Sequence, residues 1–117
     1  MSSAEPVAVT GGLVFRALSA GTAFTCGVTT SDEAWCWGSN WTGQLGDGTT
    51  SDSPQPVRTA PGLRLRAVVA GGVHACGIAV DGLAYCWGDN RVGQLGDGTT
   101  TARLTPVRVI GQTEPVP

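Results

Sequence analysis

The four cysteines carry the most reactive side chains of this chain, and their spacing is regular. Cys26 and Cys36 lie ten residues apart, and Cys76 and Cys86 repeat that spacing fifty residues later. Asp81-Gly82 predicts a tight turn between the second pair, and a three-residue loop there would set Cys76 opposite Cys86 on paired strands. The cysteines are therefore candidates for two disulfides, with four buried free thiols as the alternative. Oxidised cysteines would favour a source outside the cytoplasm.

Metal binding and catalysis are not expected. Structural zinc sites favour cysteines separated by two to four residues, whereas this chain has no such pair and one histidine, His74. Phe24 stands at the matching place fifty residues earlier, so packing or hydrogen bonding is the expected role of His74. Spacing places neither a nucleophile beside a base nor a pair of carboxylates. We therefore predict no catalytic residue, no metal site, no cofactor and no enzymatic activity.

Two glycine-rich loops, residues 43–50 and 93–100, could suggest a phosphate or calcium site. The phosphate-binding loop requires a lysine, and this chain contains none. The calcium loop requires alternating aspartates and a final glutamate, and neither loop has that pattern. Asp-Gly and Thr-Thr are ordinary turn sequences, so both loops are expected to be structural.

The charge and hydropathy of the chain limit its partners. Seven arginines are scattered along it, nine acidic residues outnumber them, and the net charge is -2. Proteins that bind nucleic acids by charge cluster their lysines and arginines, so we expect no nucleic-acid partner. No stretch approaches the roughly 18 to 20 apolar residues of a membrane-spanning helix, so no membrane partner is expected either.

The elements that must hold these residues form a tandem repeat. Residues 16–58 align with residues 66–108 without a gap, and 22 of the 43 positions are identical. Each unit contains short apolar stretches bounded by turn residues and shows no helical periodicity, which predicts four antiparallel strands. The predicted fold is therefore all-β, with two four-stranded antiparallel sheets. A period near 50 residues is typical of β-propeller blades.

The expected strands of the first unit follow from residue type. The small apolar residues 17–20 suit an inner strand near a crowded axis, and residues 24–30 and 34–38 suit a hairpin. Residues 56–58 include a proline, which an edge strand tolerates, and residues 6–9 repeat this outer segment. The predicted organisation is a disordered start at 1–5, an N-terminal outer strand that closes a ring at 6–14, blades at 15–63 and 64–111, and a tail at 112–117.

Three motifs carry a resemblance to a known family. They are A-G-x-x-[FH]-x-C-G-[VI], then [WY]-C-W-G-x-N-x-x-G-Q-L-G-D-G-T-T, and then P-V-R, each present in both units. Together they resemble the regulator of chromosome condensation repeat family, in the cysteine-bearing version found in bacterial proteins, over residues 6–111. The resemblance implies blades of a seven-bladed propeller. Family members include a guanine-nucleotide exchange factor and a β-lactamase inhibitor, but neither activity can be transferred residue by residue, because the motifs are framework positions.

Recurring large side chains have expected places in such blades. We predict that four of them pack between neighbouring blades, namely Trp37, Leu45, Trp87 and Leu95. Trp41 is different, because it lies in a loop with polar neighbours and its counterpart is Arg91. Trp41 and Arg91 are therefore candidate contacts for a partner molecule.

Two blades cannot close a ring, because propellers contain about four to eight. Exposed apolar sheet faces mark interaction surfaces, so the first expected partner is another copy of the chain. A trimer would supply six blades and a tetramer eight, through head-to-tail contacts. The predicted function is a non-enzymatic protein-interaction scaffold that assembles into a closed ring of blades. The alternatives are a lectin-like carbohydrate-binding module and a regulator or inhibitor of another protein.

Overall fold

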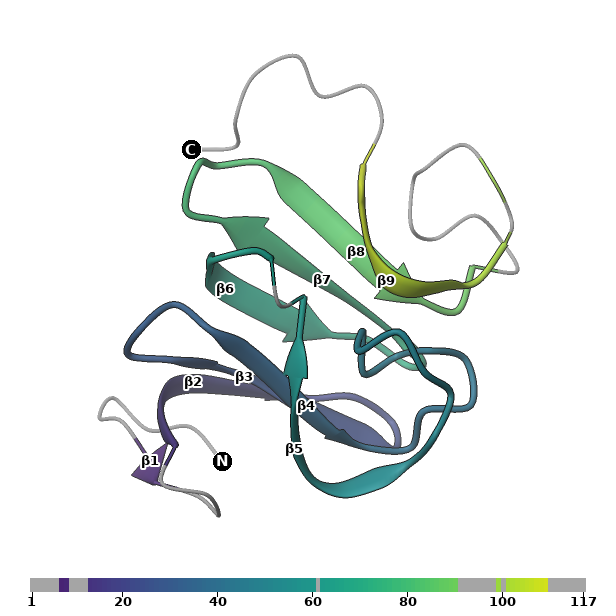
Figure 1. Cartoon of the computed structure of the whole chain (residues 1–117), viewed down its shortest axis with the longest axis horizontal. Coiled ribbons are helices and arrows are strands. Elements are labelled where there is room, and N and C mark those ends of the chain that lie inside the picture. The colour runs from purple at the N-terminus through teal and green to yellow at the C-terminus, as the bar shows by residue number, and fades with distance from the viewer. Residues whose placement is uncertain (1–6, 9–12, 61, 91–98, 100, 110–117) are drawn as a thin grey trace.

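The architecture consists of two antiparallel β-sheets (Figure 1). The computed structural model describes residues 7–8, 13–60, 62–90, 99 and 101–109. The first sheet has the order β1-β2-β3-β4-β5 and the second β6-β7-β8-β9. In chain order the strands are β1 Val7–Ala8, β2 Val14–Ala20, β3 Phe24–Thr29, β4 Ala34–Gly38, β5 Ser53–Thr59, β6 Leu65–Ala70, β7 His74–Ala79, β8 Ala84–Gly88 and β9 Arg103–Arg108. The predicted all-β fold of two four-stranded blades, β2 to β5 and β6 to β9, is confirmed; the predicted start 1–5 and tail 112–117 lie outside the described residues.

The first strand of the first blade is longer than its small apolar residues indicate. Residues 17–20 are the predicted strand, and β2 begins three residues earlier. Its pairing with β3 shifts between Phe15 and Ala17, and β6 has the matching shift between Leu65 and Ala67. Such a bulge bends a strand without ending it, so the ladder continues past the segment that the residue pattern detects.

β1 does not take the outer position that the repeat predicts for the segment 6–14. Val7 pairs with Phe15 and Ala8 with Val14, whereas the outer strand β5 lies at the opposite edge of the same sheet. Residues 6–9 resemble residues 56–59 in their side chains. Strand pairing uses backbone groups instead, so a strand can pair with any nearby sheet edge whose N–H and C=O groups are free. A ring-closing role for this segment stays a prediction.

A tight hairpin in each blade sets the cysteine register. Gly82 has a φ of 89° and takes the left-handed conformation of the three-residue loop, and Asp32, with a φ of 64°, occupies the same place in the first blade. The registers that result place the two cysteines of each blade opposite one another. The disulfides are Cys26–Cys36 and Cys76–Cys86, with Cα–Cα distances of 4.1 and 4.0 Å.

The main core lies between the two sheets. β6 runs beside β3, and together they bring one face of each blade into contact (Figure 1). The first blade contributes Phe24, Cys26, Val28, Ala34, Cys36 and Leu45, and the second contributes Leu65, Val68, Ala75, Ala79 and Trp87. Because successive residues of a strand point to opposite faces, the second face of each blade is not used in this contact. None of the described residues forms a helix of the length and hydropathy needed to span a membrane.

Replacing both cysteines of one pair by alanine is expected to destabilise the fold. Each disulfide joins residues ten apart, so loss of the cross-link in Cys76→Ala/Cys86→Ala should lower the free energy of unfolding by about 2–3 kcal/mol. Cys26→Ala/Cys36→Ala should lose more, because these side chains are fully buried between the sheets and leave a cavity. Urea denaturation measures both, and a variant as stable as the parent would contradict the pairing.

Candidate functional site

The loop between β4 and β5 is organised around the buried side chain of Asn40. Its amide nitrogen Nδ2 donates to the carbonyl oxygens of Thr49 (2.9 Å) and Ser51 (3.1 Å), and its Oδ1 accepts from the Leu45 N–H (2.9 Å). The Asn40 N–H donates to Asp52 Oδ1 at 2.7 Å. Since a buried amide is stable only when its polar atoms are hydrogen-bonded, these contacts hold the loop in one shape.

The second blade repeats this arrangement. Asn90 is also fully buried, and its Nδ2 donates to the carbonyl oxygens of Thr99 (3.0 Å) and Thr101 (2.9 Å). The turn residues of these loops were predicted from sequence, whereas the role of the two asparagines was not. The signal in the sequence is that asparagine stands at the same place in both units, two residues after the Trp-Gly pair that ends β4 and β8.

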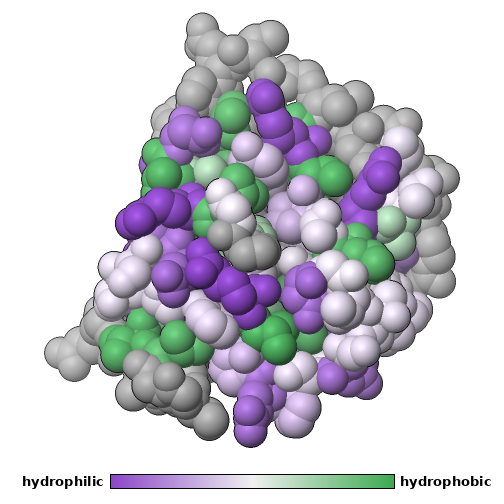
Figure 2. Space-filling model, viewed as in Figure 1, coloured by the Kyte–Doolittle hydropathy of each residue, from purple (hydrophilic) through white to green (hydrophobic). Residues whose placement is uncertain are grey.

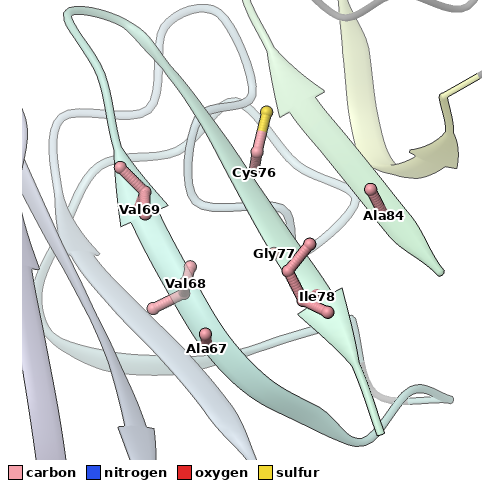
Figure 3. Close-up of a pocket in the computed structure, with 7 residues that line it drawn as sticks. All are labelled: Ala67, Val68, Val69, Cys76, Gly77, Ile78 and Ala84. Atoms are coloured by element: carbon pink, nitrogen blue, oxygen red, sulfur yellow. The ribbon is translucent and has the colours of Figure 1, made fainter. Parts of the chain in front are cut away.

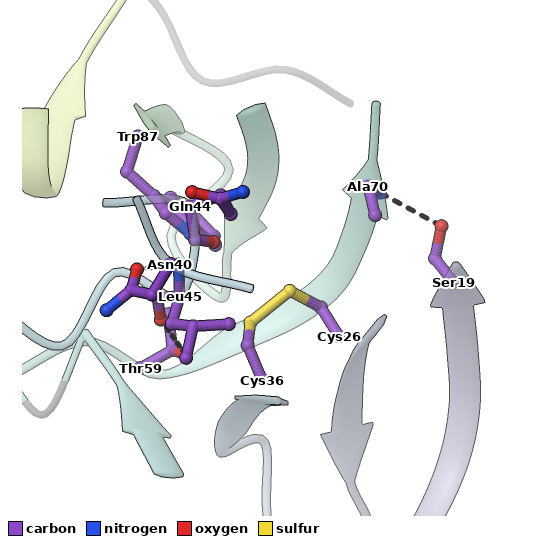
Figure 4. Close-up of a disulfide and its surroundings, with 9 residues drawn as sticks. All are labelled: Ser19, Cys26, Cys36, Asn40, Gln44, Leu45, Thr59, Ala70 and Trp87. Atoms are coloured by element: carbon purple, nitrogen blue, oxygen red, sulfur yellow. Dashed lines mark hydrogen bonds between the residues drawn. A yellow bond between two sulfur atoms is a disulfide. The ribbon is translucent and has the colours of Figure 1, made fainter. Parts of the chain in front are cut away.

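The first loop contacts the second blade through Trp87. Trp87 and Leu45 are both fully buried, and the Trp87 indole N–H donates to the Gln44 carbonyl at 3.0 Å. A Cβ at Gly46 would lie 2.8 Å from Trp87 Cδ1, so glycine is needed for this approach. The Thr59 hydroxyl donates a hydrogen bond to the Leu45 carbonyl at 2.6 Å, which ties the loop to the end of β5 (Figure 4). Trp87 and Leu45 thus lie between the blades.

Polar contacts surround this apolar centre. The Ala70 N–H of β6 donates to Ser19 Oγ of β2 at 2.9 Å, which joins the first strands of the two blades (Figure 4). Backbone bonds add to it, namely Thr22 N–H to Gly72 O (3.1 Å), Leu65 N–H to Asp32 O (2.9 Å) and Gly48 N–H to Leu104 O (2.9 Å). The inter-blade contact therefore has an apolar centre and a hydrogen-bonded rim, as is typical of protein–protein interfaces.

The first blade has an open face. It is formed by the residues whose counterparts, fifty positions later in the second blade, lie in the inter-blade contact. We define this face by Leu18, Thr25, Trp35 and Trp37, the counterparts of Val68, Ala75, Tyr85 and Trp87. All four are only half-buried. Trp37 packs on Phe15 of its own blade with ring centroids 5.6 Å apart, and its place between neighbouring blades stays a prediction. Among the residues that the structure describes, no second sheet packs on this face of the first blade.

The second blade has an open face on its other side. It is formed by Ala67, Val69, Cys76, Ile78 and Ala84, and Val69 is 65% exposed. The space-filling view shows apolar side chains at the surface in separate groups among polar ones (Figure 2). The two blades thus carry one covered and one open apolar face each.

The remaining predicted site residues are distributed as follows. Trp41 is 58% exposed in the β4–β5 loop, whereas Arg91 and Leu95 lie outside the described residues. His74 is the first residue of β7, and its ring packs against Gly71, where an added Cβ would lie 2.7 Å from the ring. In the first blade the Phe24 ring packs against Gly21 in the same way. The His74 side chain therefore has a packing role. Within the part of the chain that the structure describes, no three His, Cys, Asp or Glu side chains form a cluster that could hold a metal ion.

The contact of Trp87 with the loop can be tested with two matched glycines. Gly46 and Gly48 both have positive φ, 66° and 85°, so an alanine is strained at either position. A Cβ at Gly48 has its nearest neighbour 3.7 Å away, whereas a Cβ at Gly46 meets both Trp87 and the Thr59 methyl group at 2.8 Å. Gly46→Ala should therefore lower the unfolding free energy by about 1–3 kcal/mol more than Gly48→Ala. Equal losses in urea denaturation would show that the close contact with Trp87 is not formed.

Known structures share this arrangement of blades. Prp20p from Saccharomyces cerevisiae matches with a TM-score of 0.76 and 19% identity, over 88% of this chain and 27% of that one. Human WBSCR16 matches with a TM-score of 0.73 and 22% identity, over 86% and 26%. The ectodomain of the Physcomitrella patens receptor kinase CR4 matches with a TM-score of 0.51 and 30% identity, over 75% and 22%. The chain therefore spans about a quarter of the length of these structures.

Sequence comparison identifies the family. Among curated proteins, no sequence matches this chain significantly. One model of the regulator of chromosome condensation (RCC1) repeat matches residues 31–78 and 81–116, and a second model of the same repeat matches residues 15–44 and 65–94. These matches cover both sheets and most of the chain. The protein therefore belongs to the regulator of chromosome condensation repeat family, and its two sheets are two blades of that family's β-propeller.

Proposed function

We propose that this chain is a non-enzymatic protein-interaction scaffold, and that copies of it associate head to tail into a ring of blades. The observation that carries the proposal is the inter-blade contact within the chain. It buries one apolar face of each blade, and the matching second faces, Trp37 on the first blade and Val69 on the second, have no blade against them. Open apolar sheet faces of this kind are interaction surfaces.

Ring closure would follow from repeating one contact. The first and second blades are related by a 50-residue shift, so a third blade placed on the second by the same contact could be the first blade of another copy. Three copies would supply six blades and four copies eight, both within the range of about four to eight that propellers use. A head-to-tail contact needs such closure to avoid open fibres.

Binding of another protein at the rim is the second candidate, and the exposure of Trp41 favours it. Trp41 is 58% exposed on a loop that Asn40 holds in place. Large aromatic side chains on rigid supports are frequent contact residues. Prp20p is described with its binding properties to Gsp1p and histones. For this chain the partner would be a protein that the loop contacts, in the manner of a regulator or inhibitor; a sugar that stacks on Trp41 is the lectin-like alternative.

The mass of the protein in solution tests the scaffold proposal. Size-exclusion chromatography with light scattering should give three or four times the 11.9 kDa of the chain, and the value should fall towards 11.9 kDa on dilution. Trp41→Ala is the matched control, since Trp41 lies on the loop and not on an open face; it should leave the mass unchanged. A folded protein that remains at 11.9 kDa at every concentration would contradict the proposal.

A further inference from the structure

The open face of the second blade contains a shallow hollow of about 100 Å³ (Figure 3). Its floor is formed by strands β6, β7 and β8. The lining residues are Ala67, Val68, Val69, Cys76, Gly77, Ile78 and Ala84. Every one of them is apolar, glycine or a disulfide cysteine, so the hollow offers no charged or strongly polar group to a ligand. Its chemistry fits the side of another sheet better than a small polar molecule.

The same place on the first blade is already occupied within the chain. Fifty residues earlier the lining residues are on β2, β3 and β4, and β6 packs against that surface. Burial shows the effect of this cover. Cys26, Val28 and Ala34 are fully buried, whereas their counterparts on the second blade are only half-buried. The hollow is therefore an uncovered copy of a surface that binds the first strand of a blade.

We infer that the hollow binds β2 of a second copy of this chain, in the way that the first blade binds β6. The inference rests on the proposed self-association and specifies its contact. Val68, which β6 brings to the existing contact, is 8% exposed there. Its counterpart Leu18 is on the open face of the first blade and is half-buried. Leu18 of the incoming copy would thus contact the hollow, with Trp37 beside it on the same face.

One hydrogen bond of the existing contact has no equivalent between copies. Within the chain, Ser19 Oγ accepts from the Ala70 N–H at 2.9 Å. Between copies, the amide would belong to Ala20 and the opposite residue would be Val69, whose side chain cannot accept a hydrogen bond. The contact between copies therefore has one hydrogen bond fewer than the contact within the chain, and only the contact between copies should weaken on dilution.

A charge in the hollow should prevent association. Val69→Asp places an unpaired carboxylate on the surface that β2 must cover, so association of the otherwise folded chain should weaken at least tenfold in sedimentation velocity across a dilution series. Val80→Asp is the matched control, because Val80 is also exposed, at 52%. Its counterpart Thr30 stays exposed beside the covering blade. Val80→Asp should associate like the parent chain.

A second variant should strengthen the same contact without altering its shape. Val69→Thr supplies a hydroxyl at the place of Ser19 Oγ while keeping one methyl group, so association should tighten by about three- to tenfold. If the parent chain associates but both Val69 variants associate as it does, the copies meet elsewhere and this inference is wrong while the scaffold proposal stands. If the parent chain does not associate at all, the scaffold proposal itself fails.

Discussion

A blade with two apolar faces needs a neighbour on each side, and this requirement governs the whole molecule. The chain satisfies it once, where the face that carries the Cys26–Cys36 disulfide is covered by β6. Burying apolar area is the main favourable term in such a contact, at roughly 25 cal/mol for each Å² removed from water. The hairpins and the disulfides fix the register of the strands that form these faces. The faces on the far sides are also lined by apolar side chains, and within the described part of the chain no other blade covers them.

The glycine-rich loop acts as a spacer between blades because a polar network makes it rigid. Asn40 binds backbone atoms up to eleven residues away, so the loop keeps its shape without secondary structure. That shape presents the Gln44 carbonyl to the Trp87 indole, and Gly46 leaves room for the ring. In the first blade the longest identical run of the two repeats, residues 43–50, therefore includes residues that pack between the blades, Leu45 and Gly46.

Local patterns predicted the strands, the turns and the cysteine register, since each depends on residues near one another in the chain. Counting residues outward from the turn at Gly82 was enough to predict that Cys76 lies opposite Cys86. The environments of Trp37 and Trp87 could not be predicted in this way, because the same residue at the same place in two closely similar strands differs in whether the other blade lies against it. The pairing of β1 with β2 was missed for a related reason, since edge pairing leaves no side-chain pattern. The role of Asn40 was missed because its partners are backbone groups.

The most direct test of this account compares the two disulfides with each other. Cys26–Cys36 is covered by β6, whereas Cys76 lines the open hollow, and a reductant must reach a sulfur atom to react. Differential alkylation with peptide mass spectrometry can follow the reduction of each pair at several protein concentrations. We expect Cys76–Cys86 to be reduced faster in dilute protein and to be protected as concentration rises, while Cys26–Cys36 stays slow throughout. Reduction of Cys76–Cys86 at a rate independent of protein concentration would contradict the claim that copies cover this face.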